Sequence, residues 1–204
     1  MRIIILAFAF IFYSFTVQCS DAVTEEYRQK LKEYPSFLID FFPDTIANVY
    51  SLESDDDTTS LCISYKYFNY ESKIVKPSDF LIKYTASNPD LITIKRETVT
   101  YWDRSKKIFY KSINKDSICY YPIPYFELDD KSMIGVKTED VYSENTACGL
   151  SKDFEIYVLD SKPGNYWKGL KPLDYMPEGW KNGYSKGICI NEESNIAIYW
   201  FVVW

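Results

Sequence analysis

Apolar and polar residues alternate with a period of two along much of this chain, as in strands buried on one side. The clearest case is residues 59–67, where Leu61, Ile63 and Tyr65 fall on one face and Cys62 and Ser64 on the other. The same alternation, or a short apolar run, predicts further strands at residues 80–84, 91–102, 107–112, 118–126, 133–141 and 196–204. Hairpin-length links join several of these segments, so the pattern predicts an antiparallel, mainly β fold.

Three segments depart from this strand pattern. Residues 25–34 predict a short amphipathic helix that ends before Pro35. Residues 154–159 fit either a strand or a short helix, and both alternatives stay open. Residues 164–187 are rich in proline, glycine and aromatic residues, which predicts a long ordered loop held down by Cys189.

The amino-terminal end has the layout of a secretory signal peptide. One positive charge at Arg2 precedes an unbroken apolar run over residues 3–12 and then a short polar stretch. A retained membrane anchor is the alternative, but the apolar run is well short of the roughly 20 residues that span a bilayer. We therefore expect residues 1–20 to be a signal peptide and residues 21–204 to form one secreted domain.

Composition narrows the function classes. The chain has no histidine, so it lacks the commonest general base and the commonest metal ligand, and we expect neither an enzyme nor a cofactor. Acidic residues outnumber basic ones by 29 to 23, which repels phosphate backbones and makes nucleic acid an unexpected partner. The 19 Tyr, 13 Phe and 5 Trp favour sheet, although an A/T-rich genome would also raise the tyrosine content.

Four cysteines remain once the signal peptide is removed: Cys62, Cys119, Cys148 and Cys189. An even number in a secreted chain predicts two disulfides, and spacing alone leaves all three pairings open. No Cys-x-x-Cys motif is present, which disfavours zinc. The acidic run at Asp55–Asp57 lacks the spacing of a calcium loop, so we expect no metal site there.

The order of these parts resembles the salivary lipocalins of ticks. The shared layout is a signal peptide, a short helix, an acidic stretch before Cys62, repeated hairpins and then Cys119, Cys148 and Cys189. The resemblance implies a lipocalin-like antiparallel barrel with a short N-terminal helix, a long C-terminal segment and two disulfides. It implies the pairings Cys62–Cys189 and Cys119–Cys148. The Cys-Asp-aliphatic triplet of the amine-binding members is replaced here by Cys119, Tyr120 and Tyr121.

The resemblance further implies that the barrel sequesters a small host mediator, with histamine or another biogenic amine as first candidate. Tyr50 and Glu53 lie at positions similar to a ligand-binding pair of the tick histamine binders. Alternatively, these two residues bind nothing and belong to the end of a strand that runs into a solvated acidic loop. Trp102 and Tyr110 flank a predicted hairpin and are candidates for lining the cavity mouth, or else ordinary core residues. We expect a monomer that does not associate with membranes.

Two other functions stay open. If the cavity is apolar rather than acidic, the same fold would take a lipid such as a fatty acid or a leukotriene. Alternatively, the chain is a salivary effector that docks a host protein through aromatic residues of the segment 164–187, or these residues pack over an open barrel end. The aromatic residues in question are Trp167, Tyr175, Trp180 and Tyr184.

Overall fold

A computed structural model of the whole chain describes nine stretches of sequence. They are residues 24–44, 49–56, 61–68, 73–89, 91–94, 121–126, 141–143, 145–174 and 176–204, and for residues 49–56 and 61–68 only the backbone is described. The chain divides into two compact units, Met1–Ile46 and Ala47–Trp204, and each is treated by itself.

The first unit contains two short helices. One covers residues 24–31 and the other, α2, covers Ser36–Ile39. The predicted helix over 25–34 is confirmed over most of its length, but it ends earlier, since Pro35 disfavours helical backbone at the residue before it. Tyr27 is buried and its hydroxyl donates a hydrogen bond to the Pro43 carbonyl at 2.9 Å. Neither helix has the length and apolar character needed to cross a bilayer.

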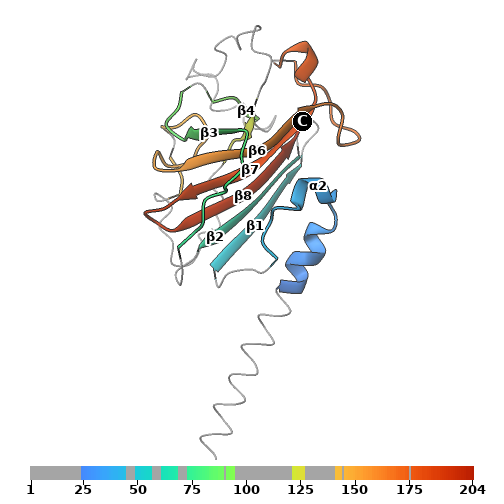
Figure 1. Cartoon of the computed structure of the whole chain (residues 1–204). Coiled ribbons are helices and arrows are strands. Elements are labelled where there is room, and N and C mark those ends of the chain that lie inside the picture. The colour runs from blue at the N-terminus through green and yellow to red at the C-terminus, as the bar shows by residue number, and fades with distance from the viewer. Residues whose placement is uncertain are drawn as a thin grey trace, which may run out of the picture. The chain divides into compact units, whose positions relative to one another are not determined.

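The second unit is built on one six-stranded sheet (Figure 1). Its strands follow the spatial order β1 (Val49–Asp56), β2 (Leu61–Phe68), β8 (Ile196–Val203), β7 (Gly183–Asn191), β6 (Glu155–Pro163) and β3 (Ile82–Thr85). All five neighbouring pairs are antiparallel, which confirms the mainly β, antiparallel prediction. Within the described ranges β1 and β3 are the two edges, and no pairing closes the sheet into a barrel.

A small second sheet accompanies the first. It pairs β4 (Thr93–Ile94) with β5 (Ile123–Pro124), and this pairing is parallel. The prolines in the segment 118–126 predicted an edge or irregular strand, and β5 is only two residues long. The predicted strand 107–112 lies outside the described residues.

Most sequence-predicted strands in the described ranges are confirmed, with shifts of one or two residues at their ends. The predictions at 59–67, 80–84 and 196–204 correspond to β2, β3 and β8, and the ambiguous segment 154–159 belongs to β6. One prediction about the acidic stretch is wrong. Ser54, Asp55 and Asp56 continue β1 and do not form a loop, because each pairs across the ladder with a residue of β2. This pairing overrides the low strand propensity of aspartate.

The predicted loop over residues 164–187 is also partly wrong, because β7 begins inside it at Gly183. Glycine usually weakens a strand, and here it marks a close approach. A Cβ added at Gly183 would lie 2.6 Å from the Trp204 ring, and one at Gly187 would lie 2.6 Å from the Trp200 ring. These glycines therefore make room for two indoles, and they were misread as signals of a turn.

Nearly all residues of β7 and β8 are buried, on both faces of the sheet, and the hydrophobic core cluster lies on the face that we call the inner face. Alternate residues of β8 supply it: Ile196, Ile198, Trp200 and Val202. From β6 and β7 come Ile156, Val158 and Cys189, and the short segments outside the large sheet add Ile94, Ile123, Phe126, Val141 and Leu150. All of these side chains are at most 5% exposed, so the inner face is fully buried against the rest of this unit.

Candidate functional site

The site residues that the sequence suggested lie mostly beyond what the structure describes. Tyr50 and Glu53 are in the middle of β1, where their backbones pair with Tyr67 and Ser64 of β2. Their side chains are outside the described part, as are Trp102 and Tyr110 altogether. The amine site built on these four residues therefore stays a prediction.

The positions of Cys62, Cys148 and Cys189 bear on the disulfides expected from the sequence. Cys148 and Cys189 are both buried in the core, and no disulfide occurs among the side chains that the structure describes. Cys62 pairs with Val202 on β8, whereas Cys189 pairs with Ile198. Two strand spacings and four residues of offset separate their Cα atoms by roughly 16 Å, while a disulfide spans at most about 7 Å. This register does not allow the pairing Cys62–Cys189 that the resemblance implied.

A row of small residues runs along the inner face of β7. Residues directly opposite in a ladder share a face, and Ser185, Gly187 and Cys189 stand opposite the core residues Val202, Trp200 and Ile198. Gly183, two residues before Ser185, continues the row. Each of the two glycines lies under an indole, with Trp204 over Gly183 and Trp200 over Gly187. Ser185 therefore lies in a row of small residues of β7, between the positions that the Trp204 and Trp200 rings cover.

The two indoles differ in how their N–H groups are satisfied. The Trp204 Nε1–H donates to the Trp180 carbonyl at 2.9 Å. Trp200 is completely buried, and within the part of the chain that the structure describes its Nε1 has no hydrogen-bond partner; the Oγ of the equally buried Ser185 has none there either. A buried polar atom without a partner is rare and costs about 1–3 kcal/mol. We call Ser185, Gly187 and Trp200 the inner-face site.

Both unpartnered atoms gather over β7. The ring atoms of Trp200 nearest to the Gly187 position are Cζ2 and Cε2, and Nε1 is bonded to Cε2. The indole edge that carries the N–H therefore lies over β7 at Gly187, and Ser185 is two residues, or roughly 7 Å, along that strand on the same face.

The inner-face site lies among apolar side chains of the core cluster. The buried residues of the described ranges include no acidic side chain and one basic one, Lys186, which stands opposite Phe201 and therefore on the other face of β7. On β6, Ser161 stands opposite Ser185, but its hydroxyl already donates to the Tyr184 carbonyl at 3.2 Å. The site therefore offers hydrogen-bond donors in an apolar setting, and no charge to balance an ion.

Part of the segment 164–182 packs against the core cluster and against Trp204. Leu173 and Met176 are buried in the core cluster, and Trp180 packs against it and stacks on Trp204 with ring centroids 6.4 Å apart. Trp167 is half-buried. Tyr184 is buried in β7, where its hydroxyl donates to Asp160, while Tyr175 is outside the described residues. Trp180 and Tyr184 therefore have partners within the domain.

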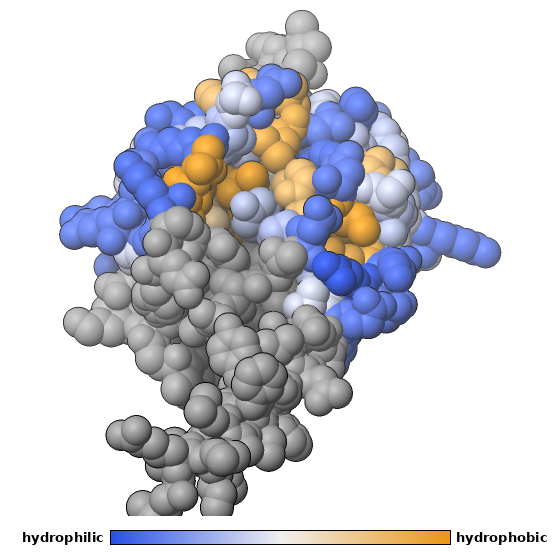
Figure 2. Space-filling model, turned by 60° about the horizontal axis from the view of Figure 1, so that its bottom comes forward, coloured by the Kyte–Doolittle hydropathy of each residue, from blue (hydrophilic) through white to orange (hydrophobic). Residues whose placement is uncertain are grey.

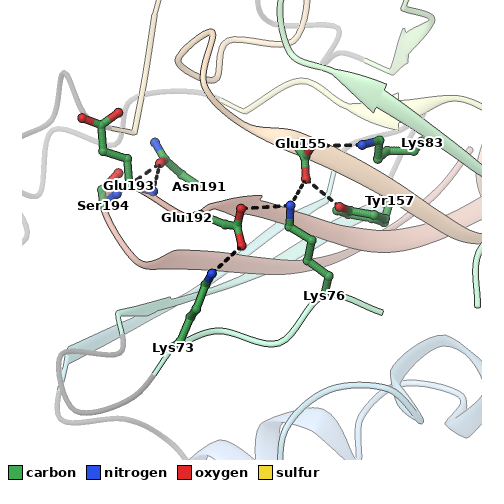
Figure 3. Close-up of polar contacts among 9 residues, drawn as sticks. All are labelled: Lys73, Lys76, Lys83, Glu155, Tyr157, Asn191, Glu192, Glu193 and Ser194. Carbon is green, nitrogen blue, oxygen red and sulfur yellow. Dashed lines mark hydrogen bonds and ion pairs between the residues drawn. The ribbon is translucent and has the colours of Figure 1, made fainter. Parts of the chain in front are cut away.

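A chain of ion pairs lies outside the core, where the segment before β3 meets β6 and the turn between β7 and β8 (Figure 3). The Lys76 ammonium lies 2.7 Å from Glu155 and 3.0 Å from Glu192. Lys83 makes a second ion pair with Glu155 at 3.0 Å, and Lys73 one with Glu192 at 3.2 Å. We call these five residues the lysine–glutamate clamp.

The clamp shifts the ionisation of its members. The hydrogen bond from Lys76, followed by those from Tyr157 and Lys83, lowers the pKa of Glu155 to about 2. The pKa of the Lys76 ammonium is raised in turn by its bonds to Glu155 and Glu192. Each acid here has a basic partner, so the clamp acts as a structural tie between segments, and nothing in its geometry marks a reaction centre.

Other chemistry in the described residues is limited. Burial raises the pKa of the Cys148 thiol, which keeps it protonated, and its sulfur lies 3.9 Å from the Ala86 carbonyl oxygen. No group of three metal-ligating side chains occurs within the part that the structure describes. Separate apolar areas lie among polar ones on one face of the molecule (Figure 2), and the exposed apolar side chains of the second unit are Val75, Phe80 and Leu81.

Comparison with protein-family models, with curated proteins and with solved structures finds no match. The likeness to the tick lipocalins therefore rests on the order of sequence features alone. The inner-face site was missed in the sequence. Its signal is the spacing of Gly183, Ser185 and Gly187 two residues apart, followed by Trp200 and Trp204 in an apolar strand.

Proposed function

We propose that this chain is a secreted protein that sequesters a small ligand on the inner face of its sheet, in the manner of a lipocalin. The observation that carries the proposal is the pair of buried, unpartnered polar atoms, Trp200 Nε1 and Ser185 Oγ. Folded proteins rarely keep such atoms without a partner, and a ligand would supply the missing one. Binding sites of this kind are apolar with a few polar groups that fix orientation.

The finer features of the proposal rest on the sequence. The charged, apolar and polar regions at the start support export, and the antiparallel sheet is compatible with a barrel. Four cysteines in an exported chain support two disulfides. Because Cys62 and Cys189 are too far apart in this register, the partner of Cys62 would be Cys119 or Cys148. The layout shared with the tick salivary lipocalins supports a host mediator as the ligand.

Two ligand classes remain, and the described residues favour one of them. A biogenic amine needs carboxylates to offset its lost hydration, and no acidic side chain is among the buried residues that the structure describes. Glu53 is the candidate carboxylate, with Tyr50 as its aromatic neighbour in sequence. An apolar ligand matches the aromatic and aliphatic inner face better, so we propose a lipid-like mediator as the principal ligand and histamine as the alternative.

Calorimetric titration of the mature protein, residues 21–204, tests this function. The panel comprises histamine, serotonin, a long-chain fatty acid and a leukotriene. Saturable binding of any member supports the proposal, and the class that binds identifies the ligand chemistry. Amine binding that is lost in Glu53→Gln would favour the histamine alternative. Silence across the whole panel, together with silence of a neutral ketone of similar chain length, would contradict small-ligand sequestration and favour docking to a host protein.

A further inference from the structure

We infer that the inner-face site takes the carbonyl oxygen of a neutral, largely apolar ligand, held by the Trp200 Nε1–H and the Ser185 hydroxyl. This inference rests on the proposed function and names the chemistry of that same site. It goes beyond the choice between amines and fatty acids, because it assigns the polar end of the ligand to two named atoms.

The polarity of the two protein atoms determines the first part of the inference. An indole N–H can only donate a hydrogen bond, and a serine hydroxyl can donate as well as accept. An occupant that satisfies both atoms at once must therefore present an acceptor. An ammonium group carries only donors, so it would leave the Trp200 N–H unsatisfied and place a positive charge beside it.

The absence of charge around the site determines the second part. A buried ionised carboxylate is costly unless a cation or several donors compensate it. Among the described residues the buried cation is Lys186, which stands opposite Phe201 on the other face of β7 from Ser185, and the whole chain carries a net charge of −6. A neutral carbonyl avoids this cost, because two donors are enough to satisfy its two lone pairs.

The packing of the site fits a carbonyl attached to an apolar body. Gly187 has no side chain, and the Trp200 edge that carries Nε1 lies directly over it. Val202 faces Ser185 from β8, and Leu173 and Met176 belong to the same core cluster. The polar contact is thus confined to one point on the small-residue row of β7, with apolar side chains around it.

Three probes that share a ten-carbon chain and differ in their head group test the inference. They are 2-decanone, decanoate and decylammonium, each titrated calorimetrically into the mature protein. We expect 2-decanone to bind roughly tenfold more tightly than decylammonium, and more tightly than decanoate, because only the ketone satisfies both donors without burying a charge.

Two variants remove the proposed donors to the ligand. Two matched control variants remove a serine hydroxyl and an indole N–H that already have hydrogen-bond partners within the protein. Ser185→Ala and Trp200→Phe should each weaken the binding of 2-decanone by about tenfold. Ser161→Ala and Trp204→Phe, whose polar atoms already bond the Tyr184 and Trp180 carbonyls, should change it less than about twofold.

Thermal unfolding without ligand gives a second readout, which a merely structural role of the serine would not produce. Ser185→Ala removes an unsatisfied hydroxyl, so its midpoint should stay level or rise by about 2–4 °C, while that of Ser161→Ala falls. Ser185→Ala is expected to fold at least as well as the native protein. The effect of this variant on 2-decanone binding can therefore be measured even if Trp200→Phe does not fold.

Several outcomes would overturn the inference. Decylammonium or decanoate binding best, or 2-decanone affinity unchanged in Ser185→Ala, would refute the carbonyl assignment while small-ligand binding itself stands. The same holds if no ten-carbon probe binds but a member of the mediator panel does. Silence of both sets of ligands would remove the proposed function together with the inference.

Discussion

The ammonium of Lys76 lies 2.7 Å from a carboxylate oxygen of Glu155, and this contact joins the segment before β3 to β6. The same ammonium also reaches Glu192 in the turn between β7 and β8. Three parts of the chain that are distant in sequence therefore meet at one cation (Figure 3). Because the pairs are partly exposed, each contributes modestly, and the network matters more than any single pair.

The clamp predicts that stability falls as the solution becomes acidic. The folded-state pKa of Glu155 is lowered to about 2 from its ordinary value of 4.5, so its contribution is complete above pH 4.5. It is lost as the pH falls from about 4.5 towards 2, since the unfolded chain binds the proton first. Glu155→Gln should cost about 1 kcal/mol at neutral pH after allowance for solvent screening, and progressively less below pH 4.5.

Urea unfolding of the native protein and of Glu155→Gln at pH 7, 4 and 3 measures this difference. Glu178→Gln is the control, because Glu178 pairs with Lys181 at 2.8 Å but its side chain is 89% exposed. A stability difference that stays constant between pH 7 and 3 would show that ionisation of Glu155 does not stabilise the fold.

Gly187→Ala should be one of the most damaging single substitutions in the sheet. The added Cβ would lie 2.2 Å from the Tyr157 carbonyl oxygen and 2.6 Å from the Trp200 ring, and the backbone atom cannot move aside cheaply. We expect a loss of about 3 kcal/mol, in the upper range for overpacking a core. Chemical denaturation followed by tryptophan fluorescence measures it.

Gly179→Ala is the matched control for this substitution. Gly179 lies in the short 3-10 helix η2 (Glu178–Trp180), and a Cβ there meets nothing within 4 Å. The control should be neutral within about 0.5 kcal/mol. Equal effects of the two substitutions would mean that β7 does not pass this close to the Trp200 indole.

The strands that alternate cleanly were predictable, and the strand that uses glycine was not. A period of two predicts β2, and a nearly continuous apolar run predicts β8, whose residues are buried on both faces. In β7 the inner positions are Gly183, Ser185, Gly187 and Cys189, which look like a loop in the sequence. Their small size makes sense only beside the Trp200 and Trp204 rings, and that relationship depends on tertiary packing.

The candidate site could be predicted even less well. Tyr50, Glu53, Trp102 and Tyr110 followed from likeness to a family and from hairpin positions, and their side chains are outside the described part. The Trp200 N–H and the Ser185 hydroxyl were not recognisable in the sequence, because any buried serine or tryptophan is presumed to have a partner. Trp204 in the same strand does have one, and only the coordinates separate the two cases.

The strand register makes a prediction about disulfides. Peptide mapping of the purified protein under non-reducing conditions should find no peptide that joins Cys62 to Cys189, because the two Cα atoms are roughly 16 Å apart in this sheet. Blocking free thiols before digestion prevents exchange during the experiment. Recovery of a Cys62–Cys189 peptide would require a different register between β2, β8 and β7.

The turn between β7 and β8 predicts a difference between two substitutions at Asn195. This residue has a φ of 54°, in the left-handed region, and its Oδ1 accepts a hydrogen bond from the Ile74 N–H at 3.2 Å. Asn195→Gly loses the hydrogen bond but fits the backbone, whereas Asn195→Ala loses the bond and is strained as well. Alanine should therefore cost about 1 kcal/mol more than glycine in urea unfolding. If the two variants are equally stable, the left-handed backbone at Asn195 carries no strain.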